Sequence, residues 1–276
     1  MLITCPGAVA LPGAPLVTRL RDGIPSRNLV GLYMMQEGAL TEVISDQLTD
    51  SSGNGAHGAI LSGYTMPIQR AHGLEVTGPY GMIAELPIPA GAARFTVLLA
   101  VRPVMVTSTA NLYSTYFGAT INGAYASAPS ASKVNYPYPV LNCPHQTGQR
   151  MGVFDDTALS AQVFGATRTI PAGGRLVNES TVIGYSVDGP ANTMRLADIS
   201  SEAYTYTAAS VGTYFDGTAK GNITIGAWRN ANVAIVDPVF AELHAVAIYD
   251  RAMDHAEMAD ARTRLKNKIA ARGITY

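Results

Sequence analysis

The segment LTDSSGNGAHGAI, residues 48–60, is the stretch on which the assignment of the fold depends. Gly53, Gly55 and Gly58 have the G-x-G-x-x-G spacing that, in dinucleotide-binding proteins, follows a buried strand and opens a helix. Here the flanking sequences are QLTDSS and AILSGY, and neither fits that context. The glycine spacing therefore does not indicate a nucleotide site.

The same segment carries the residues that begin an EF-hand loop, in the order Asp50, Ser52, Asn54 and Gly55. An EF-hand needs a bidentate glutamate at its twelfth position, which is Leu61 here. The EF-hand interpretation is therefore excluded. Two interpretations stay open, a tight turn built from Asx and glycine residues and a calcium site of another design.

The composition favours a protein made of strands and turns. Of the 276 residues, 47% are apolar and only 14% are charged, against roughly 25% charged in typical soluble domains. The 27 glycines and 16 prolines suit many turns, and the low charge suits a surface partly covered in an assembly. A net charge of −1 provides no field that would attract nucleic acid, so we expect no nucleic-acid partner. The sequence contains no run of eighteen apolar residues, so we expect no membrane span.

The first 28 residues are predicted to form an irregular arm used for anchoring or assembly. This stretch is interrupted by Pro6, Pro12 and Pro15 and lacks the basic region of a secretory signal, which we therefore do not expect. Cys5 and Cys143 are the only cysteines, and the sequence leaves open whether they pair.

Period-two patterns dominate the rest of the chain. In RFTVLLAVRPV, residues 94–104, alternate apolar residues from Phe95 to Val101 share one face. STVIGYSVDG (180–189) predicts a strand that ends in a turn at Asp188-Gly189. AELHAVAIYD (241–250) is apolar on both faces, as in a central strand that is covered on both sides. Many short strands without alternating helices predict an antiparallel β-sandwich over residues 29–252.

A helix is predicted over residues 253–276. Asp254 and Glu257 have the spacing of a capping box. The apolar residues that follow at helical spacing, and that we expect on one buried face, are Met258, Ala261, Leu265 and Ile269.

Three segments in order, residues 31–60, 73–104 and 223–261, resemble the concanavalin A-like lectin/glucanase superfamily, and in particular its laminin-G-like domains. The last of them contains AIYDRA, which is similar to the strand of the type D-E-V-x-I-Y-N-R-A-L that closes those domains. The resemblance implies an all-β, two-sheet antiparallel jelly-roll sandwich. Residues 103–180 carry none of this resemblance.

The resemblance also implies where calcium would bind. In laminin-G-like domains the ion is held by the acid of the glycine-rich loop, by loop carbonyls and by an acid on the final strand. Carried over to this chain, the ligands would be Asp50, Asn54 and Glu242. Ala241 stands where the family has the leading acid of that strand.

The sequence lacks the carboxylate pattern of a glycan-cleaving enzyme. Such relatives place two or three acids on one face of a strand, as in E-x-D-x-x-E, so that acid and nucleophile face the same glycosidic bond. No segment of this chain has that spacing, and the adjacent Asp155 and Asp156 would point to opposite faces of a strand. We therefore expect no enzymatic activity and no catalytic residues.

Residues 107–150 combine Tyr, Ser, Asn, Gly and Ala with only two charged residues, Lys133 and Arg150. This composition is typical of surfaces where rigid aromatic rings and adaptable polar groups contact a ligand. Two interpretations stay open, a ligand-binding surface and a packing or subunit contact. The candidate binding residues are Tyr113, Tyr116, Tyr125, Tyr136 and Tyr138.

These observations predict a non-catalytic lectin-like module that binds a host-surface glycan or a partner protein. We expect it on a virion surface, made in the host cytoplasm, as a phage tail-fibre, spike or head-decoration component. There it would form a homo-oligomer and contact other virion proteins. The alternatives are an extracellular location, a glycan hydrolase or lyase on the same fold, and a purely structural assembly subunit.

Overall fold

The structure is a computed structural model. It describes residues 23–60, 66–76, 84–89, 91–104, 113–120, 137–144, 149–155, 161–168, 180–197, 203–218, 222–225 and 240–274. For β8 to β11 it describes the backbone and its pairing. The elements are β1 (Leu29–Tyr33), β2 (Gln47–Leu48), β3 (Gly58–Ile60), β4 (Ile68–Gln69), β5 (Leu74–Val76), β6 (Ala84–Pro89), β7 (Arg94–Val104), β8 (Tyr113–Thr120), β9 (Pro137–Pro144), β10 (Gln149–Asp155), β11 (Ala161–Arg168), β12 (Thr181–Asp188), β13 (Thr193–Ala197), β14 (Ala203–Thr207), α1 (Ala209–Tyr214), β15 (Asn222–Ile225), β16 (Phe240–Tyr249) and α2 (His255–Ala270).

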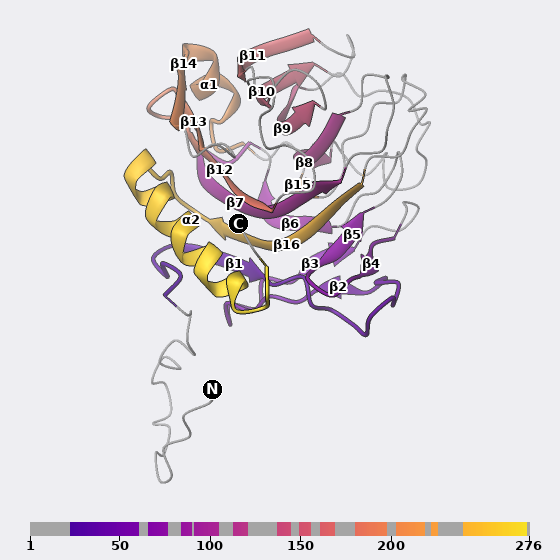
Figure 1. Cartoon of the computed structure of the whole chain (residues 1–276). Coiled ribbons are helices and arrows are strands. Elements are labelled where there is room, and N and C mark those ends of the chain that lie inside the picture. The colour runs from indigo at the N-terminus through magenta and orange to yellow at the C-terminus, as the bar shows by residue number, and fades with distance from the viewer. Residues whose placement is uncertain are drawn as a thin grey trace.

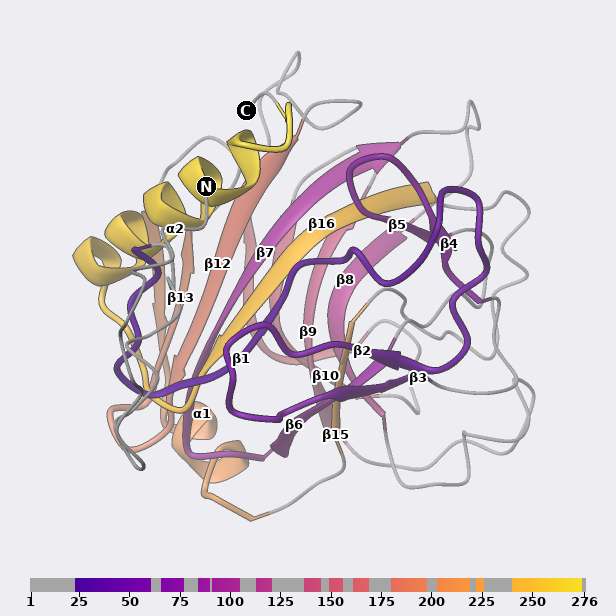
Figure 2. The same ribbon diagram turned by 90° about the horizontal axis from the view of Figure 1, so that it is seen from below.

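The strands form two eight-stranded sheets that pack face to face (Figures 1 and 2). Sheet A has the order β14-β13-β12-β7-β16-β5-β4, with β1 also paired to β16. Sheet B has the order β11-β10-β9-β8-β15-β6-β3-β2. Every strand pairing that joins these elements is antiparallel. The all-β antiparallel sandwich expected from the sequence is confirmed, whereas the finer jelly-roll assignment stays a prediction.

The main core lies between the two sheets. One face of β7 enters it as the alternation predicted, with Phe95 through Val101 fully buried at every second position. Phe95 packs against Tyr185 of β12 and against Phe215 beyond α1, with ring centroids 6.1 Å and 5.8 Å away. Sheet B contributes Leu48 and Ile225 to the same cluster. Apolar side chains from both sheets therefore hold the sandwich together.

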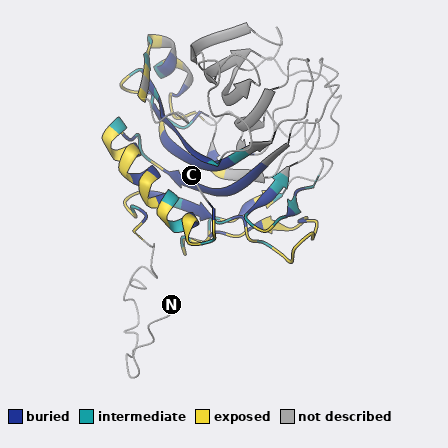
Figure 3. Cartoon of the chain, in the orientation of Figure 1, coloured by how far each residue is buried: buried dark blue, intermediate teal, exposed yellow. Residues whose placement is uncertain are grey.

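A second core lies between the outer face of sheet A and α2, as Figure 3 shows. Asp254 caps α2 and forms the predicted capping box with Glu257. The four apolar helix residues predicted to share a face are all buried, and full burial of a large apolar side chain stabilises the fold by roughly 1.5–3 kcal/mol. Because sheet A is covered on both faces, β16 is apolar on both faces, which confirms that prediction.

The six-residue α1 was not predicted from the sequence, because it is too short to produce a helical repeat. Residues 1–22, which make up most of the predicted arm, lie outside the described residues. The division of the chain at residues 28 and 252 stays a prediction. Within the part of the chain that the structure describes, no helix is both long and apolar enough to cross a membrane.

Candidate functional sites

The carboxylate of Asp50 organises the glycine-rich loop. Its Oδ1 accepts hydrogen bonds from the N–H groups of Leu32 (2.9 Å) and Ser52 (2.8 Å). Its Oδ2 accepts from the Ser52 hydroxyl (2.8 Å) and from the N–H groups of Asn54 and Ala56 (both 3.1 Å). The chain wraps around one acceptor group, which is how an aspartate specifies a tight turn.

These hydrogen bonds also set the charge state of Asp50. Burial alone would raise the pKa of the carboxyl group, but the donors from Leu32, Ser52 and Ala56 favour the ionised form and hold the pKa below its ordinary value. Asp50 is therefore a carboxylate throughout the neutral range, and its charge is compensated by oriented N–H dipoles.

The loop is tied to β1 by further contacts. Asn54 Nδ2 donates to the carbonyls of Leu29 (2.7 Å) and Val30 (3.1 Å). The hydroxyl of Tyr33 donates to the carbonyl of Ala56, and both burial and the nearby Asp50 charge raise the pKa of that hydroxyl. Aspartate and asparagine in this loop therefore have defined roles in joining it to the sheet.

Two glycines of the loop are required by the backbone. Gly53 and Gly55 have φ values of +87° and +73°, in the left-handed region that residues with a Cβ seldom adopt. Asp50, Ser52, Gly53, Asn54 and Gly55 each have a defined part in this turn.

The calcium interpretation stays a prediction. The structure brings Asp50 and Asn54 together but leaves Glu242 on the half of β16 that pairs with β5, whereas β1 beside the loop pairs with the other half. Among the described residues, no group of three or more His, Cys, Asp or Glu side chains is arranged to hold a metal ion. A cation at Asp50 would have to displace hydrogen-bond donors that already occupy both carboxylate oxygens.

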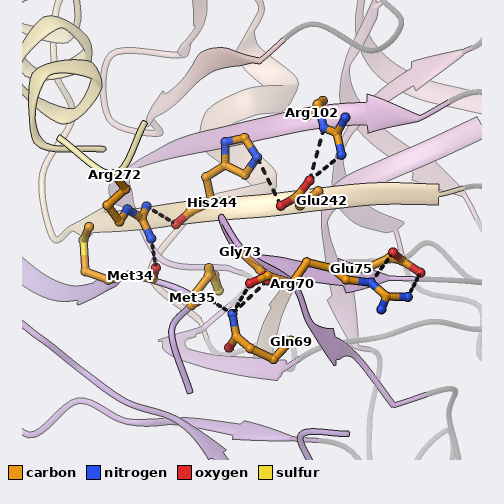
Figure 4. Close-up of polar contacts among 10 residues, drawn as sticks. All are labelled: Met34, Met35, Gln69, Arg70, Gly73, Glu75, Arg102, Glu242, His244 and Arg272. Carbon is orange, nitrogen blue, oxygen red and sulfur yellow. Dashed lines mark hydrogen bonds and ion pairs between the residues drawn. The ribbon is translucent and has the colours of Figure 1, made fainter. Parts of the chain in front are cut away.

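Glu242 belongs instead to a row of charges across sheet A, which Figure 4 shows. Arg102, Glu242 and Glu75 lie opposite one another on β7, β16 and β5, and Arg70 follows β4. Arg102 donates to Glu242 Oε2 from Nε (3.1 Å) and Nη2 (2.5 Å). Arg70 donates to the two oxygens of Glu75 at 2.6 Å and 3.0 Å. We call these four residues the charged row.

Two neighbouring side chains, His244 and Arg102, keep Glu242 ionised. Burial would raise the pKa of this carboxyl group, but His244 and Arg102 outweigh burial and lower the pKa to about 2. The side chain of Glu242 is 5% exposed, and Oε1 lies 3.9 Å from Nε2 of His244, which is longer than a hydrogen bond. Burial lowers the pKa of His244, and Arg272 and Arg102 lower it further, against the opposing effect of Glu242.

His244 occupies a β-bulge in β16. The register with β7 passes from Leu243 to Ala245 and leaves His244 as the extra residue. Arg272, beyond the end of α2, donates to the carbonyls of His244 (2.8 Å) and Met34 (2.7 Å). In the same region, Gln69 Nε2 donates to the carbonyls of Met35 and Gly73 (Figure 4). The bulge therefore joins β16 to the end of β1 and to the end of α2.

The sequence analysis did not predict that Glu75 and Glu242 lie opposite each other on neighbouring strands, because it considered carboxylates along single strands only. Paired carboxylates are the chemistry of glycoside hydrolysis, where one group must be protonated to act as the general acid. Here each carboxylate is bound to its own arginine, and Glu242 is buried with a low pKa. This arrangement suits an ion-pair ladder and does not provide a general acid.

The Tyr-rich segment contributes to sheet B. Tyr113 and Tyr116 lie on β8 and Tyr138 lies on the neighbouring β9, while Tyr125 and Tyr136 lie outside the described residues. Tyr113 pairs with Pro144, six positions from Tyr138, so these two residues are roughly 20 Å apart along the strand direction. Tyr116 lies at a register shift between Thr115 and Phe117. Tyr113 and Tyr138 therefore lie toward different ends of these two strands. Cys143 also lies on β9, whereas Cys5 is outside the described residues.

Comparisons with known proteins bear on the fold. No protein-family model and no curated protein sequence matches the chain. The sialidase of Trypanosoma rangeli is similar with a TM-score of 0.54 at 13% identity, over 89% of this chain and 34% of that chain. The binding domain of botulinum neurotoxin serotype G is similar with a TM-score of 0.53 at 11% identity, over 87% of this chain and 51% of that one. The serotype D binding domain has a TM-score of 0.52 at 10% identity, with 84% and 51% covered.

At these identities the likeness concerns the fold alone. The chain spans about a third of the length of the sialidase and about half of the toxin domains. The group includes both an enzyme and binding domains, so the shared β-sandwich is compatible with either kind of function. The choice between them depends on the residues of this chain.

Proposed function

We propose that this chain is a non-catalytic β-sandwich module that binds a glycan. The state of Glu242 carries the proposal: its ion pair with Arg102 (2.5 Å), its burial and its low pKa remove it as a general acid. The facing Glu75 is held by Arg70 at 2.6 Å. The fold likeness to toxin binding domains supports a binding role for such a sandwich.

The surface we assign to glycan binding is the β8–β9 part of sheet B. It carries Tyr113, Tyr116 and Tyr138 in a segment with little charge. Aromatic faces suit the apolar C–H surfaces of sugar rings, while Ser, Asn and backbone groups suit their hydroxyls. The register shift at Tyr116 supports this assignment, because bulges often occur where a side chain is redirected at a functional site.

The test is binding of the purified full chain to a glycan array. We expect binding to a limited set of glycans, and we expect Tyr116→Ala to weaken it at least tenfold, about 1.4 kcal/mol. Tyr206→Phe, on β14 of sheet A, is the matched control and should leave binding unchanged. Binding that survives Tyr113→Ala, Tyr116→Ala and Tyr138→Ala would remove this surface from the proposal.

The same chain is then incubated with the glycans that it binds. We expect no release of reducing sugar. Release that is lost in both Glu75→Gln and Glu242→Gln would replace the binding module with a hydrolase. Absence of any binding, together with failure of particle assembly when residues 1–28 are deleted, would favour a purely structural subunit.

We place this module on a phage virion, in a tail fibre, spike or head decoration. The charged fraction of 14% supports a protein whose surface is largely covered by neighbouring subunits. Antibody labelling of intact particles tests the placement, and signal only in the soluble host fraction would contradict it.

A further inference from the structure

The strand β14, with the sequence AYTYT, ends sheet A beside α1 (Figure 1). Within the described residues its only strand partner is β13, and its register with β13 contains no bulge. Charged residues, prolines and bulges are the features by which most proteins keep a sheet edge from pairing, and β14 has none of them. The end strands β2 and β4 are two residues long, and β11 ends in Arg168. β14 is therefore the edge best suited to pair with another strand.

The backbone groups of every second residue of β14 point away from β13. The N–H of Ala208, which has an extended backbone, donates to the carbonyl of Asn192 on the β13 side (3.0 Å). These directions alternate along a strand, so the peptide groups of Tyr206 and Tyr204 also face β13. The residues whose N–H and C=O groups point to the free edge are Ala203, Thr205 and Thr207. All three residues are exposed.

The helix α1 lies on the core side of the sheet and not across this edge. Val211 of α1 and Phe215 beyond it belong to the main core. A Cβ on Gly212 would lie 2.8 Å from the carbonyl oxygen of Gly189, so α1 packs at the turn between β12 and β13. The described elements thus leave the edge of β14 open.

The strand is complementary to itself in one antiparallel register. When Thr205 lies opposite Thr205 of a second copy, Ala203 lies opposite Thr207, and every outward residue of the strand has a partner. Each of these pairs exchanges two hydrogen bonds. Any shift of this register leaves an outward residue beyond the end of the partner strand. We propose that two copies of the chain join through their β14 strands, antiparallel to each other, with a twofold axis at Thr205.

The charges near the axis are compatible with this contact. Arg195 is the charged residue of β13, directly opposite Thr205. In the joined sheet the two copies of Arg195 would be three strand spacings apart, about 14 Å. This distance exceeds the screening length of roughly 8 Å at physiological ionic strength, so their repulsion is weak. Because one surface meets its own copy, the contact closes at a dimer and forms one continuous sheet from both A sheets.

Sedimentation velocity of the full chain over a wide concentration range tests the proposal. We expect a concentration-dependent dimer that Thr205→Pro weakens at least tenfold. Proline removes the central outward N–H but no hydrogen bond to β13, and prolines are tolerated at such edge positions. Thr205→Val is the matched control, because it loses the hydroxyl that contacts His255 but keeps the N–H. It should associate like the wild-type chain, and melting temperatures check that both variants fold.

Charge substitutions at the exposed positions 203 and 207 test the register. The double variant Ala203→Lys, Thr207→Lys places like charges opposite each other in two pairs and should weaken the dimer at least tenfold. Ala203→Glu with Thr207→Lys places opposite charges there, and it should associate at least tenfold more tightly than the double lysine variant. Thr263→Lys, at an exposed position on α2, is the control for added charge and should associate like the wild-type chain.

Amide hydrogen exchange, followed residue by residue by NMR, identifies the contact directly. The amide of Thr205 should exchange fast in dilute protein and slowly in concentrated protein, while the amide of Tyr206 is slow in both. A wild-type chain that is monomeric at every concentration would overturn the proposal, as would a dimer that survives Thr205→Pro or the two lysines. Slow exchange at Thr205 in the monomer would overturn it too, because another segment of the same chain would then cover the edge. None of these readouts depends on glycan binding, so this proposal and the proposed function can fail separately.

Discussion

Thr96 and Ser186 face each other across β7 and β12 with their hydroxyl oxygens 3.1 Å apart, and together they hold the peptide groups that lead into α2. The N–H of Met253 donates to both hydroxyls, at 3.1 Å and 2.9 Å. Thr96 donates to the carbonyl of Arg251 (2.8 Å), and Ser186 donates to the carbonyl of Met253 (3.0 Å). Both side chains are fully buried, so these hydroxyls replace water for a turn that would otherwise lack partners.

Ser186→Ala is therefore expected to lower the free energy of unfolding by about 1–3 kcal/mol, since it leaves buried peptide groups less satisfied. Thr96→Val should cost a similar amount. The double variant should cost less than the sum, because both hydroxyls serve the same N–H group. Urea unfolding measures all three. Thr263→Ala, at an exposed hydroxyl on α2, is the control and should change stability by no more than about 0.5 kcal/mol.

Asp50→Asn tests the turn interpretation of the glycine-rich loop. An amide nitrogen cannot accept the N–H groups that now reach Oδ2 from Asn54 and Ala56. We expect a loss of about 2–3 kcal/mol of stability, because each unsatisfied buried group carries its own cost. Asp46→Asn, at an exposed position nearby, is the matched control. Equal stability of the two variants would contradict the role assigned to Asp50.

The calcium prediction is checked by thermal melting with added Ca²⁺ and with EDTA. Because protein donors occupy both oxygens of Asp50, we expect the same melting temperature in the two conditions. A rise in Ca²⁺ that Asp50→Ala abolishes would establish the site that the family resemblance implies.

Much of this fold could be predicted from single strands, because the pattern of apolar and polar residues along a strand shows which of its faces is buried. Alternation gave the buried face of β7, and a strand that is apolar on both faces gave the coverage of β16 on both sides. The spacing of Asp254 and Glu257 gave the cap of α2. None of these patterns could give the facing of Glu75 and Glu242, which depends on the pairing of strands far apart in the chain. The bulge at His244 also escaped prediction, because it is visible only in the register between β16 and β7.

Stability should fall in two stages as the pH is lowered. The pKa of His244 is lowered from 6.5 by burial, so the unfolded chain binds a proton more readily, and stability falls as the pH drops below about 6.5. The pKa of Glu242 is lowered from 4.5 to about 2, so the stability it contributes is present above pH 4.5 and is lost as the pH falls toward 2.

Urea unfolding between pH 8 and 3 measures both stages. His244→Gln should flatten the first stage, while His255→Gln should change it less, because His255 is only partly buried. The second stage should be on the order of 2 kcal/mol for Glu242, and Glu242→Gln should remove it while lowering stability at neutral pH. A first stage that is unchanged in His244→Gln would show that other groups cause it.

Gly73→Ala and Gly53→Ala separate steric contact from backbone conformation. A Cβ on Gly73 would lie 2.0 Å from the carbonyl oxygen of Leu243 and 3.1 Å from Cα of His244, so the turn before β5 would have to move away from the bulge. We expect a loss of more than about 3 kcal/mol, as for other clashes in a packed interior. A Cβ on Gly53 meets nothing within 4 Å, and its cost of about 1–2 kcal/mol would come only from the left-handed backbone. Urea unfolding of the two variants gives the comparison. Equal losses of stability in the two variants would mean that the turn at Gly73 can move away from β16. The bulge at His244 would then not depend on the close approach of Gly73.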